Sequence, residues 1–363
     1  MVAQGFSRGT GLQPCDKRML DQTARPIVNA LTVDVEDYFQ VSAFEGVVSR
    51  DEWGSYESRV VANTGRLLDT FDEFGVHATF FVIGWVAERH PYLVARIASA
   101  GHEVASHSYE HRLVYDMTPA EFREDLRRAK SALEDAGGVR IVGFRAPSYS
   151  ITSRSQWALD VLIEEGYRFD SSIFPIHHDR YGIASAPRHP HVITRRAGSI
   201  LEVPPSTVRL GGVNLPIAGG GYFRLMPYLW TRWALRRVNQ RETQPVTFYL
   251  HPWEVDPGQP RLTAPWLSRF RHYQNLARTT PRLRRLLTDF RFDSIAATLR
   301  EFESTRRETS ERQTSGSDSR FLLPPEAVDS QLHPGRPATL DSRPGPVRPE
   351  GLEGRRGHPV RRA

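Results

Sequence analysis

Short strand-like runs alternate with amphipathic helical segments over most of the chain, and this alternation limits the possible folds more than any other feature. The strand-like runs span residues 27–33, 78–83, 103–105, 142–144 and 246–250. Apolar residues recur at helical spacing over 60–74, 91–100, 119–136 and 155–165. Strands that alternate with helices usually pair in parallel, so the pattern predicts an α/β fold with a parallel sheet, open or closed into a barrel.

Capping residues indicate where several of these helices begin and end. Gly75 and Gly101 each follow a helical segment, at the position where a left-handed glycine commonly ends a helix. Thr118, Pro119 and Glu121 supply an N-cap, a proline at the first helical position and the acid of a capping box. We therefore predict a helix that begins at Pro119.

Composition separates a core-forming region from two polar ends. The chain has 363 residues, 39% of them hydrophobic, which is enough to bury a sizeable core. Residues 1–25 are polar and aperiodic, and residues 306–363 are rich in Pro, Gly, Ser and Arg, so we expect both to be disordered. The formal net charge of +6 is dispersed, which favours a solvated basic surface; attraction to an anionic polymer is the alternative.

The number of cysteines and the length of the apolar runs give information on where in the cell the protein is located. Cys15 is the single cysteine of the sequence, so an intramolecular disulfide cannot form. We find neither a signal-peptide pattern nor a run of about 18 apolar residues that would span a bilayer. We therefore expect a cytoplasmic location, with a periplasmic one as the alternative, and no nucleic-acid partner.

Polar residues that can take part in catalysis or metal binding follow four of the predicted strands. Asp34, Glu36 and Asp37 come directly after the first strand, where three close carboxylates need a compensating metal ion or arginine; a solvated acidic turn is the alternative. His107 and His111 follow the 103–105 strand, and in a helix or tight turn both imidazoles can reach one ion. Two imidazoles and one carboxylate are a usual ligand set for catalytic zinc.

Two further strand ends carry an arginine and a histidine. Arg145 can pair with a carboxylate such as Asp34, and a backbone N–H in the following loop can point at a developing oxyanion. His251 has the chemistry of a general acid that protonates a leaving amine. A surface turn and a core histidine are the alternatives for these two positions. Together the four motifs contain what metal-assisted amide hydrolysis requires.

In this order, the motifs resemble those of the NodB-type polysaccharide deacetylases, carbohydrate esterase family 4, over roughly residues 28–300. The resemblance implies a distorted (β/α) barrel of seven or eight strands, a polysaccharide or oligosaccharide substrate, and a divalent metal, by default Zn²⁺. Asp34 matches the family's catalytic base, and His107 and His111 match its metal-binding motif. The third ligand is then Glu36 or Asp37, because the usual adjacent pair of aspartates is replaced here.

The resemblance also assigns the remaining catalytic residues. Arg145 and Tyr149 match the family's RxPY-like motif, with one additional residue between the proline and the tyrosine. His251 approximates the late Leu-x-His motif without its intervening residue. Asp170 resembles the fourth motif, which implies that it helps to orient the acid histidine.

A closer resemblance is to the deacetylases of exosortase (PEP-CTERM) exopolysaccharide loci. The segments that carry it are 33–40, 144–152, 219–224 and 251–257. Members have a C-terminal extension of uncharacterised function. This implies a barrel core over 26–200 and an extension over 201–305 that completes the barrel and carries the late histidine motif.

We therefore expect a metal-dependent hydrolase that removes N-acetyl groups from the amino sugars of a polysaccharide during exopolysaccharide biosynthesis. The nearest alternative is the same site acting on O-acetyl or cyclic ureide bonds. A non-catalytic glycan-binding module is the second, and a basic scaffold that binds polymers through its arginine-rich tail is the third. The sequence does not indicate the sugar or the oligomeric state.

Overall fold

The computed structural model describes residues 26–313 of the chain. The segments 1–25 and 314–363, both predicted to be disordered, lie outside this range. Residues 306–313, predicted as the start of the disordered tail, instead form the end of helix α10 (Ile295–Gln313). No helix of the described part is long and apolar enough to cross a membrane.

The centre of the structure is a mostly parallel sheet. The described strands are β1 (Val28–Val35), β2 (Thr79–Val82), β3 (Glu103–Ser106), β4 (Gly143–Phe144), β5 (Phe169–Asp170), β6 (His191–Arg195), β7 (Gly198–Glu202), β8 (Thr207–Leu210), β9 (Val213–Pro216), β10 (Thr247–Leu250) and β11 (Arg291–Asp293). Seven of them pair in parallel in the order β10-β1-β2-β3-β4-β5-β7. β6 forms an antiparallel hairpin with β7, β11 pairs with the start of β1, and β8 and β9 form a separate hairpin.

A few hydrogen bonds extend the outer edge of β10 toward the far side of the sheet. Tyr249 donates its N–H to the carbonyl of Ala218 at 2.7 Å, and Thr247 donates its N–H to Ser206 Oγ at 2.8 Å. Ser206 follows β7, the other end of the parallel order. The sheet therefore curves into a distorted, incomplete barrel, and the predicted fold class is confirmed.

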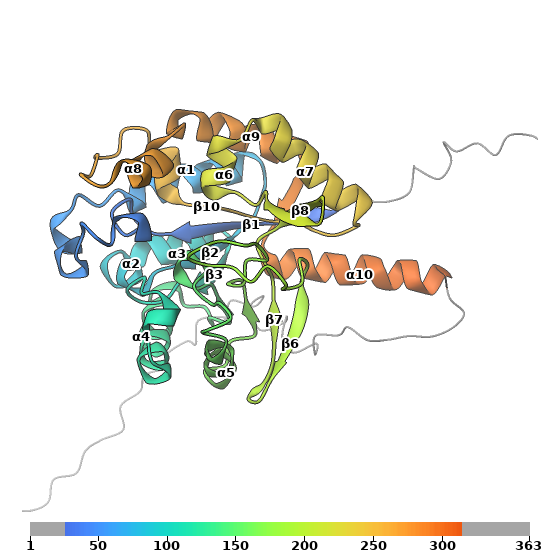
Figure 1. The fold of residues 1–363 in the computed structure, drawn as a ribbon, viewed down its shortest axis with the longest axis horizontal. Coiled ribbons are helices and arrows are strands. Elements are labelled where there is room, and N and C mark those ends of the chain that lie inside the picture. The colour runs from blue at the N-terminus through green and yellow to red at the C-terminus, as the bar shows by residue number, and fades with distance from the viewer. Residues whose placement is uncertain (1–25, 314–363) are drawn as a thin grey trace, which may run out of the picture.

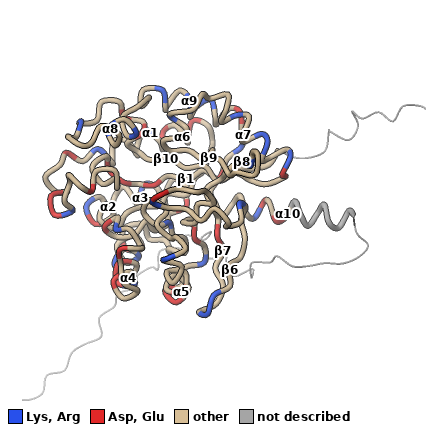
Figure 2. Tube along the Cα trace, in the orientation of Figure 1, with Lys and Arg blue, Asp and Glu red and all other residues tan. Residues whose placement is uncertain are grey.

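Helices cover the sheet on both sides. They are α1 (Val60–Glu73), α2 (Gly84–Arg89), α3 (Pro91–Ser99), α4 (Pro119–Gly137), α5 (Trp157–Glu164), α6 (Gly220–Leu225), α7 (Tyr228–Arg241), α8 (Trp266–Tyr273), α9 (Thr279–Asp289) and α10. In the view of Figure 1, α6 to α9 lie above β1 and β10, whereas α4 and α5 lie below the sheet. Acidic and basic positions are mixed along the helices on both sides (Figure 2), consistent with the dispersed charge of the sequence.

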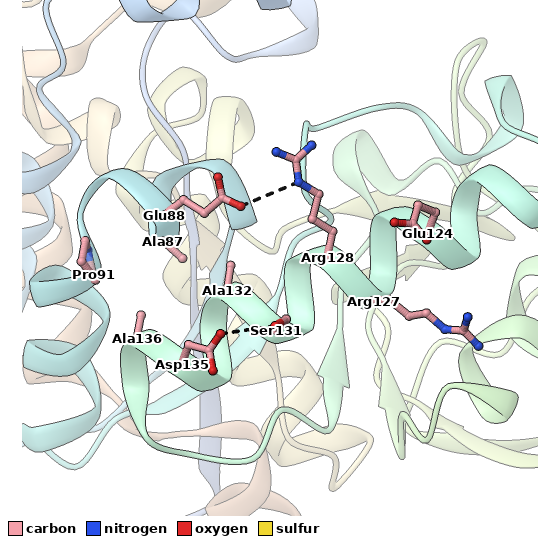
Figure 3. A pocket seen from close by; sticks show the side chains of 10 residues that line it. All are labelled: Ala87, Glu88, Pro91, Glu124, Arg127, Arg128, Ser131, Ala132, Asp135 and Ala136. Carbon is pink, nitrogen blue, oxygen red and sulfur yellow. Dashed lines mark hydrogen bonds and ion pairs between the residues drawn. The ribbon is translucent and has the colours of Figure 1, made fainter. Parts of the chain in front are cut away.

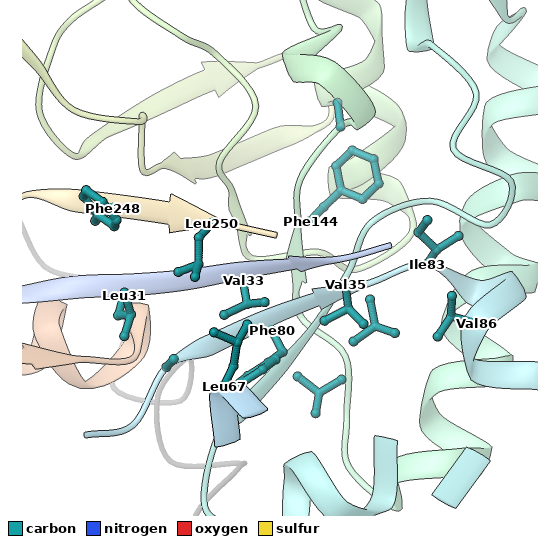
Figure 4. Packing of buried hydrophobic residues seen from close by; sticks show 14 of the residues in the cluster. Leu31, Val33, Val35, Leu67, Phe80, Ile83, Val86, Phe144, Phe248 and Leu250 are labelled. Carbon is teal, nitrogen blue, oxygen red and sulfur yellow. The ribbon is translucent and has the colours of Figure 1, made fainter. Parts of the chain in front are cut away.

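Strand β1 is the central element of the core. All eight of its residues are buried, as expected for a parallel strand covered on both faces. Leu31, Val33 and Val35 point into an apolar cluster that also contains Phe80 of β2 and Leu67 of α1 (Figure 4). Because this strand is fixed by packing along its whole length, the polar residues at its end are held in defined positions.

The helix signals of the sequence are confirmed where they were specific. Thr118 accepts a hydrogen bond from the N–H of Glu121, the Glu121 carboxylate accepts one in return, and α4 begins at Pro119 as predicted. Gly138, in the left-handed conformation with φ of 62°, follows the end of α4. The helices α6 to α9 were not predicted.

Gly219 is required by the close approach of its backbone to β10. Its φ is 123°, and a Cβ atom at this position would lie 1.8 Å from the carbonyl oxygen of Tyr249. This backbone conformation is one that only glycine adopts readily. The glycine therefore allows the chain beside α6 to pack against the outer edge of β10.

We predict that Gly219→Ala lowers the free energy of unfolding by about 2 kcal/mol or more, because a methyl group cannot fit without displacing β10. Urea unfolding followed by circular dichroism would measure the change. Gly221→Ala is the matched control, since a Cβ there meets no atom within 4 Å. Equal stability of the Gly219→Ala variant and the wild type would contradict the steric argument.

Candidate active site

The register of the sheet aligns the carboxyl ends of the neighbouring strands β1 to β4 in one row. One row across the sheet contains Val35, Val82, Ser106 and Phe144. The residues that follow in three of these strands are Glu36, His107 and Arg145, so their side chains emerge at the same edge. On the other side of β1, Leu250 pairs with Val33, which places His251 beside Asp34.

These residues line a cavity of about 240 Å³ at the carboxyl ends of the strands. Its lining includes Asp34, Glu36, His107, His111, Tyr149 and His251. The carboxyl ends of the strands are where parallel α/β folds place their ligand sites. The cavity therefore joins most of the sequence-predicted residues in one site.

Glu36, His107 and His111 form a cluster suited to a metal ion. One ligand atom from each lies within 4.8 Å of the others, and all three residues are buried. Glu36 Oε2 lies 2.8 Å from His111 Nε2, and this buried oxygen has no well-directed hydrogen-bond donor. A cation bound by this cluster would supply the missing partner of Glu36 Oε2, so the residues fit the ion that the resemblance implies.

Hydrogen bonds and burial prepare the cluster for a cation. His107 Nδ1 lies 2.8 Å from the carbonyl of Arg145, so Nδ1 carries the proton and Nε2 keeps its lone pair. Burial lowers the pKa of His107 to about 4, which keeps the ring neutral. Burial alone would raise the pKa of Glu36, but His111, His251 and His107 lower it to about 2.

A tight turn, not a helix, carries the two histidines. Ser108 and His111 have positive φ angles of 64° and 53°, and Ser108 Oγ accepts the N–H of His111 at 3.0 Å. The half-buried carboxylate of Asp125, from α4, accepts the N–H of Tyr109 at 2.9 Å. The strained turn is thus held from both sides, as is common at functional sites.

Asp37, the other candidate for the third ligand, lies outside this cluster. Its Oδ2 accepts hydrogen bonds from Ser58 Oγ at 2.8 Å and from the N–H groups of Arg59 and Val60 at 2.8 and 3.1 Å. These N–H groups are at the start of α1, so the carboxylate caps that helix. The structure brings Glu36, and not Asp37, beside the histidines.

Asp34 is held by a fully buried arginine. Arg145 Nη1 donates to Asp34 Oδ1 at 2.6 Å and to Thr32 Oγ1 at 2.8 Å, and Nη2 donates to Ser171 Oγ at 2.8 Å. The guanidinium also lies 4.1 Å from the ring of Phe81. The predicted pairing of Arg145 with Asp34 is therefore present, and it fixes the carboxylate at the floor of the cavity.

His251 faces the same floor from β10. Its Nε2 lies 3.6 Å from Glu36 Oε1 and 3.9 Å from Asp34 Oδ2, and its Nδ1 lies 2.6 Å from Glu254 Oε1. Burial alone would lower the pKa of His251, but the hydrogen bond with Glu254 and the charge of Glu36 raise it to about 9. The ring is therefore poised to carry a proton.

The residue that orients His251 is Glu254, which lies in the 3-10 helix η5 (Pro252–Val255). Arg224 of α6 in turn holds Glu254, with Nε 2.9 Å from Oε2. The same arginine donates to the carbonyls of Arg271, His272 and Gln274. Sequence reasoning did not identify Glu254 or Arg224. The spacing of three residues between His251 and Glu254 in a short helix was the available signal.

Asp170, which the resemblance assigned to this task, makes different contacts. It is fully buried and shares a hydrogen bond with Glu202. Burial raises the pKa of Asp170 to about 6. Burial and the charge of Asp170 raise the pKa of Glu202 well above its usual value. Its Oδ1 accepts the hydroxyl of Ser172, whose Oγ accepts the N–H of Ala146 at 2.8 Å. Asp170 therefore supports the loop after β4, and the contacts described for His251 are with Glu254, Glu36 and Asp34 rather than with Asp170.

In the loop after β4, one backbone donor has no described acceptor and belongs to a residue that lines the cavity. Within the 3-10 helix η4 (Pro147–Tyr149), the proline has no N–H and Tyr149 donates its N–H to the carbonyl of Ala146 at 3.0 Å. The N–H of Ser148 is the remaining donor in this segment, at a residue with φ of 49° that lines the cavity. The Tyr149 ring packs against Tyr249.

Trp253 contacts two residues of the site. Its Nε1 donates to Glu36 Oε1 at 3.2 Å, which fixes the oxygen that faces His251. The ring also stacks on His251, with centroids 5.0 Å apart. The indole therefore positions two residues of the site.

A wider hollow of about 640 Å³ lies between α2 and α4 (Figure 3). Of the residues that line it, only Ala87 is buried. Its charged groups face one another, with Arg128 3.7 Å from Glu88. It carries no buried titratable group, so the chemistry of the described residues lies in the smaller cavity.

The protein has a curved parallel α/β sheet and a carboxylate–histidine cluster at the strand ends. These features are typical of proteins that carry out metal-assisted chemistry. Comparison with known proteins is more specific. Residues 52–168 match the family model described as polysaccharide deacetylase, so this part of the chain is similar to the domains of that family. Residues 171–300 match a domain of unknown function, DUF3473. The predicted boundary near residue 200 stays a prediction.

Curated relatives match over part of their length. The peptidoglycan deacetylase-like protein FGM2 of Gibberella zeae is 30% identical over 144 residues, covering 38% of this chain and 42% of that protein. The chitooligosaccharide deacetylase of a Bradyrhizobium species is 33% identical over 99 residues, covering 27% and 43%. The chain thus spans less than half the length of these relatives.

Two solved structures resemble the fold. A Mycobacterium smegmatis protein described as a polysaccharide deacetylase has a TM-score of 0.50 and 21% identity, covering 82% of this chain and 99% of that one. Puue allantoinase has a TM-score of 0.50 and 16% identity, covering 81% and 99%. At these identities the likeness concerns the fold alone.

We predict that Glu36→Gln weakens Zn²⁺ binding at least tenfold, because it removes the charged ligand beside His111. Isothermal titration of the metal-stripped protein would measure the affinity. Asp37→Asn is the matched control: it should bind Zn²⁺ within about twofold of the wild type but lose about 1 kcal/mol of stability with the cap of α1. The opposite order of the two affinities would contradict the assignment.

Proposed function

We propose that the protein is a metal-dependent deacetylase that hydrolyses N-acetyl groups on the amino sugars of a polysaccharide, in exopolysaccharide biosynthesis. The observation that carries the proposal is the convergence of three groups on one cavity. They are the Glu36–His107–His111 cluster, the Asp34–Arg145 pair and the His251–Glu254 pair. The domain match and the names of the relatives support the substrate class.

Glu36, His107 and His111 would hold the cation, and Asp34 lines the same cavity. A divalent cation there supplies a Lewis acid for the acetyl carbonyl and lowers the pKa of a water molecule. Zinc is the ion of choice because two of the three ligands are imidazoles. The three side chains supply the binding site without rearrangement, since their ligand atoms already lie close together.

Asp34 acts as the general base in this proposal. Arg145 binds Oδ1 of its carboxylate, which leaves Oδ2 directed toward the cavity. Oδ2 can then accept a proton from the attacking water. The N–H of Ser148 would stabilise the oxyanion of the tetrahedral intermediate.

His251 acts as the general acid. Glu254 holds Nδ1, so that Nε2 carries the proton toward the floor of the cavity, where the departing amine would form. One proton passes from water to Asp34 and one from His251 to the amine. The reaction thus consumes water and the amide and yields acetate and a free amine.

The alternative within the same site is hydrolysis of an O-acetyl ester or a cyclic ureide. The fold similarity to an allantoinase motivates the second of these. Acetate release from an N-acetylated oligosaccharide, compared with turnover of its O-acetylated counterpart and of allantoin, separates the three. Turnover of only an O-acetylated sugar or only allantoin would overturn the proposed bond specificity.

We predict that Asp34→Asn lowers kcat for acetate release by about 10²- to 10⁴-fold, because the amide cannot accept the water's proton. The metal content by elemental analysis should stay at the wild-type level, since Asp34 lies outside the cluster of ligand atoms formed by Glu36 and the histidines. A wild-type rate in this variant would show that another group is the base.

We predict that Glu254→Gln lowers kcat and moves the alkaline limb of the pH–rate profile to lower pH. The raised pKa of His251 depends on the Glu254 carboxylate, and the protonated acid is lost as pH rises through that pKa. Asp256→Asn is the matched control in the same segment: it pairs with Arg59 at 2.5 Å, away from His251, and should leave the limb in place. An unshifted limb in Glu254→Gln would contradict the pairing.

A further inference from the structure

The cavity has a buried floor that contains carboxylates and an exposed rim that contains arginines. Asp34 and Glu36 lie at the floor and are buried. Arg180, after β5, and Arg271, in α8, line the same cavity and are exposed. The two arginines come from segments far apart in the sequence, so the fold assembles this rim.

The rim arginines are not needed to neutralise the floor. Asp34 has its own buried cation in Arg145 at 2.6 Å, and Glu254 has Arg224 at 2.9 Å. Glu36 faces the two histidines of the metal cluster. The positive charge at the rim is therefore additional to what the buried carboxylates require.

The same charge is not neutralised at the rim. Among the side chains that the structure describes, neither Arg180 nor Arg271 forms an ion pair, and the adjacent Asp179 lies 2.9 Å from His178 Nδ1 instead. Arg180 contacts the uncharged phenol of Tyr115. Two uncompensated guanidinium groups beside one cavity create a local positive potential.

The rim is also anchored. Arg224 donates a hydrogen bond to the backbone carbonyl of Arg271 at 3.1 Å, so the buried arginine that holds Glu254 also fixes the segment that presents Arg271. His178, which also lines the cavity, stacks on Tyr181 with ring centroids 3.9 Å apart. A fixed position makes a guanidinium selective, because less freedom is lost when it binds.

The size of the cavity determines which part of a bound polymer contacts the rim arginines. At about 240 Å³ it is smaller than the roughly 300–1,000 Å³ of pockets that enclose whole drug-sized ligands. A polymer can therefore place only a small part at the floor, and its neighbouring sugars must lie over the rim. A guanidinium there recognises carboxylate, sulfate or phosphate oxygens through paired hydrogen bonds.

From these observations we propose that the substrate is an acidic polysaccharide, in which the acetylated amino sugar adjoins a sugar that carries an anionic group. This inference rests on the proposed function and names its substrate class. Arg180 and Arg271 are the specificity-determining residues. Both belong to the segment that matches the domain of unknown function, which thereby acquires a part in substrate selection.

The test compares kcat/KM for acetate release from three oligosaccharides of equal length. One is a neutral N-acetylhexosamine oligomer, one alternates N-acetylhexosamine with hexuronate, and one is a sulfated N-acetylhexosamine oligomer. We expect the wild type to prefer an anionic oligomer by roughly fivefold to tenfold, and Arg180→Gln/Arg271→Gln to bring the substrates within about twofold. Preference for the uronate or the sulfate oligomer identifies the source of the charge.

Arg269→Gln is the matched control, because Arg269 lies in the same helix but lines a different hollow, with Trp266 and Phe270. It should keep the preference. Equal kcat/KM of the wild type on all oligomers, or an equal loss on all of them in the double variant, would overturn the inference. If none of the oligomers releases acetate, the deacetylase function fails. Calorimetric binding of the intact oligomers then decides on the rim: tighter anionic binding that the double variant abolishes supports it, and equal binding refutes it.

Discussion

The structure depends on one buried charge, the guanidinium of Arg145. It contacts the side chains of Thr32 and Asp34 on β1 and of Ser171 after β5, and the carbonyl of the same residue holds the ring of His107. An arginine removed from water is tolerated only where carboxylate and hydroxyl partners replace its hydration, and removal of one partner of such a pair typically costs about 3–5 kcal/mol. Folding of the barrel and assembly of the site are therefore coupled.

A second buried arginine repeats this arrangement on the other side of the site. Arg224 holds Glu254, and Glu254 holds His251. Asp34, the proposed base, is thus held directly by a buried arginine, and His251, the proposed acid, is held by another through Glu254. Arg145 lies in the segment that matches the polysaccharide deacetylase model, and Arg224 lies in the segment that matches the domain of unknown function. Charge stabilisation inside the protein leaves the two exposed arginines of the cavity rim available for ligand.

The sequence predicted the strands and helices with several apolar residues in a regular pattern, because burial alone determines them. It predicted a strand over 142–144, where the two-residue β4 lies, but it predicted neither β5 nor the helices α6 to α9, whose positions depend on tertiary partners. The choice between Glu36 and Asp37 could not be made from spacing, since successive residues at a strand end point in opposite directions and either carboxylate can face the histidines. That His251 contacts Glu254 and not Asp170 could not be predicted either, because it depends on which side chains the curved sheet brings together.

The pairing of β1 with β10 has a consequence for biosynthesis. Ala30 lies opposite Thr247, so the central strand acquires this neighbour only after most of the chain has left the ribosome. During translation, the apolar β1 therefore exposes an unpaired edge next to strands that have already formed. Open edges of this kind invite pairing with other chains. Slow synthesis or truncation before β10 should thus favour aggregation and recruit chaperones, in proportion to how long that edge stays open.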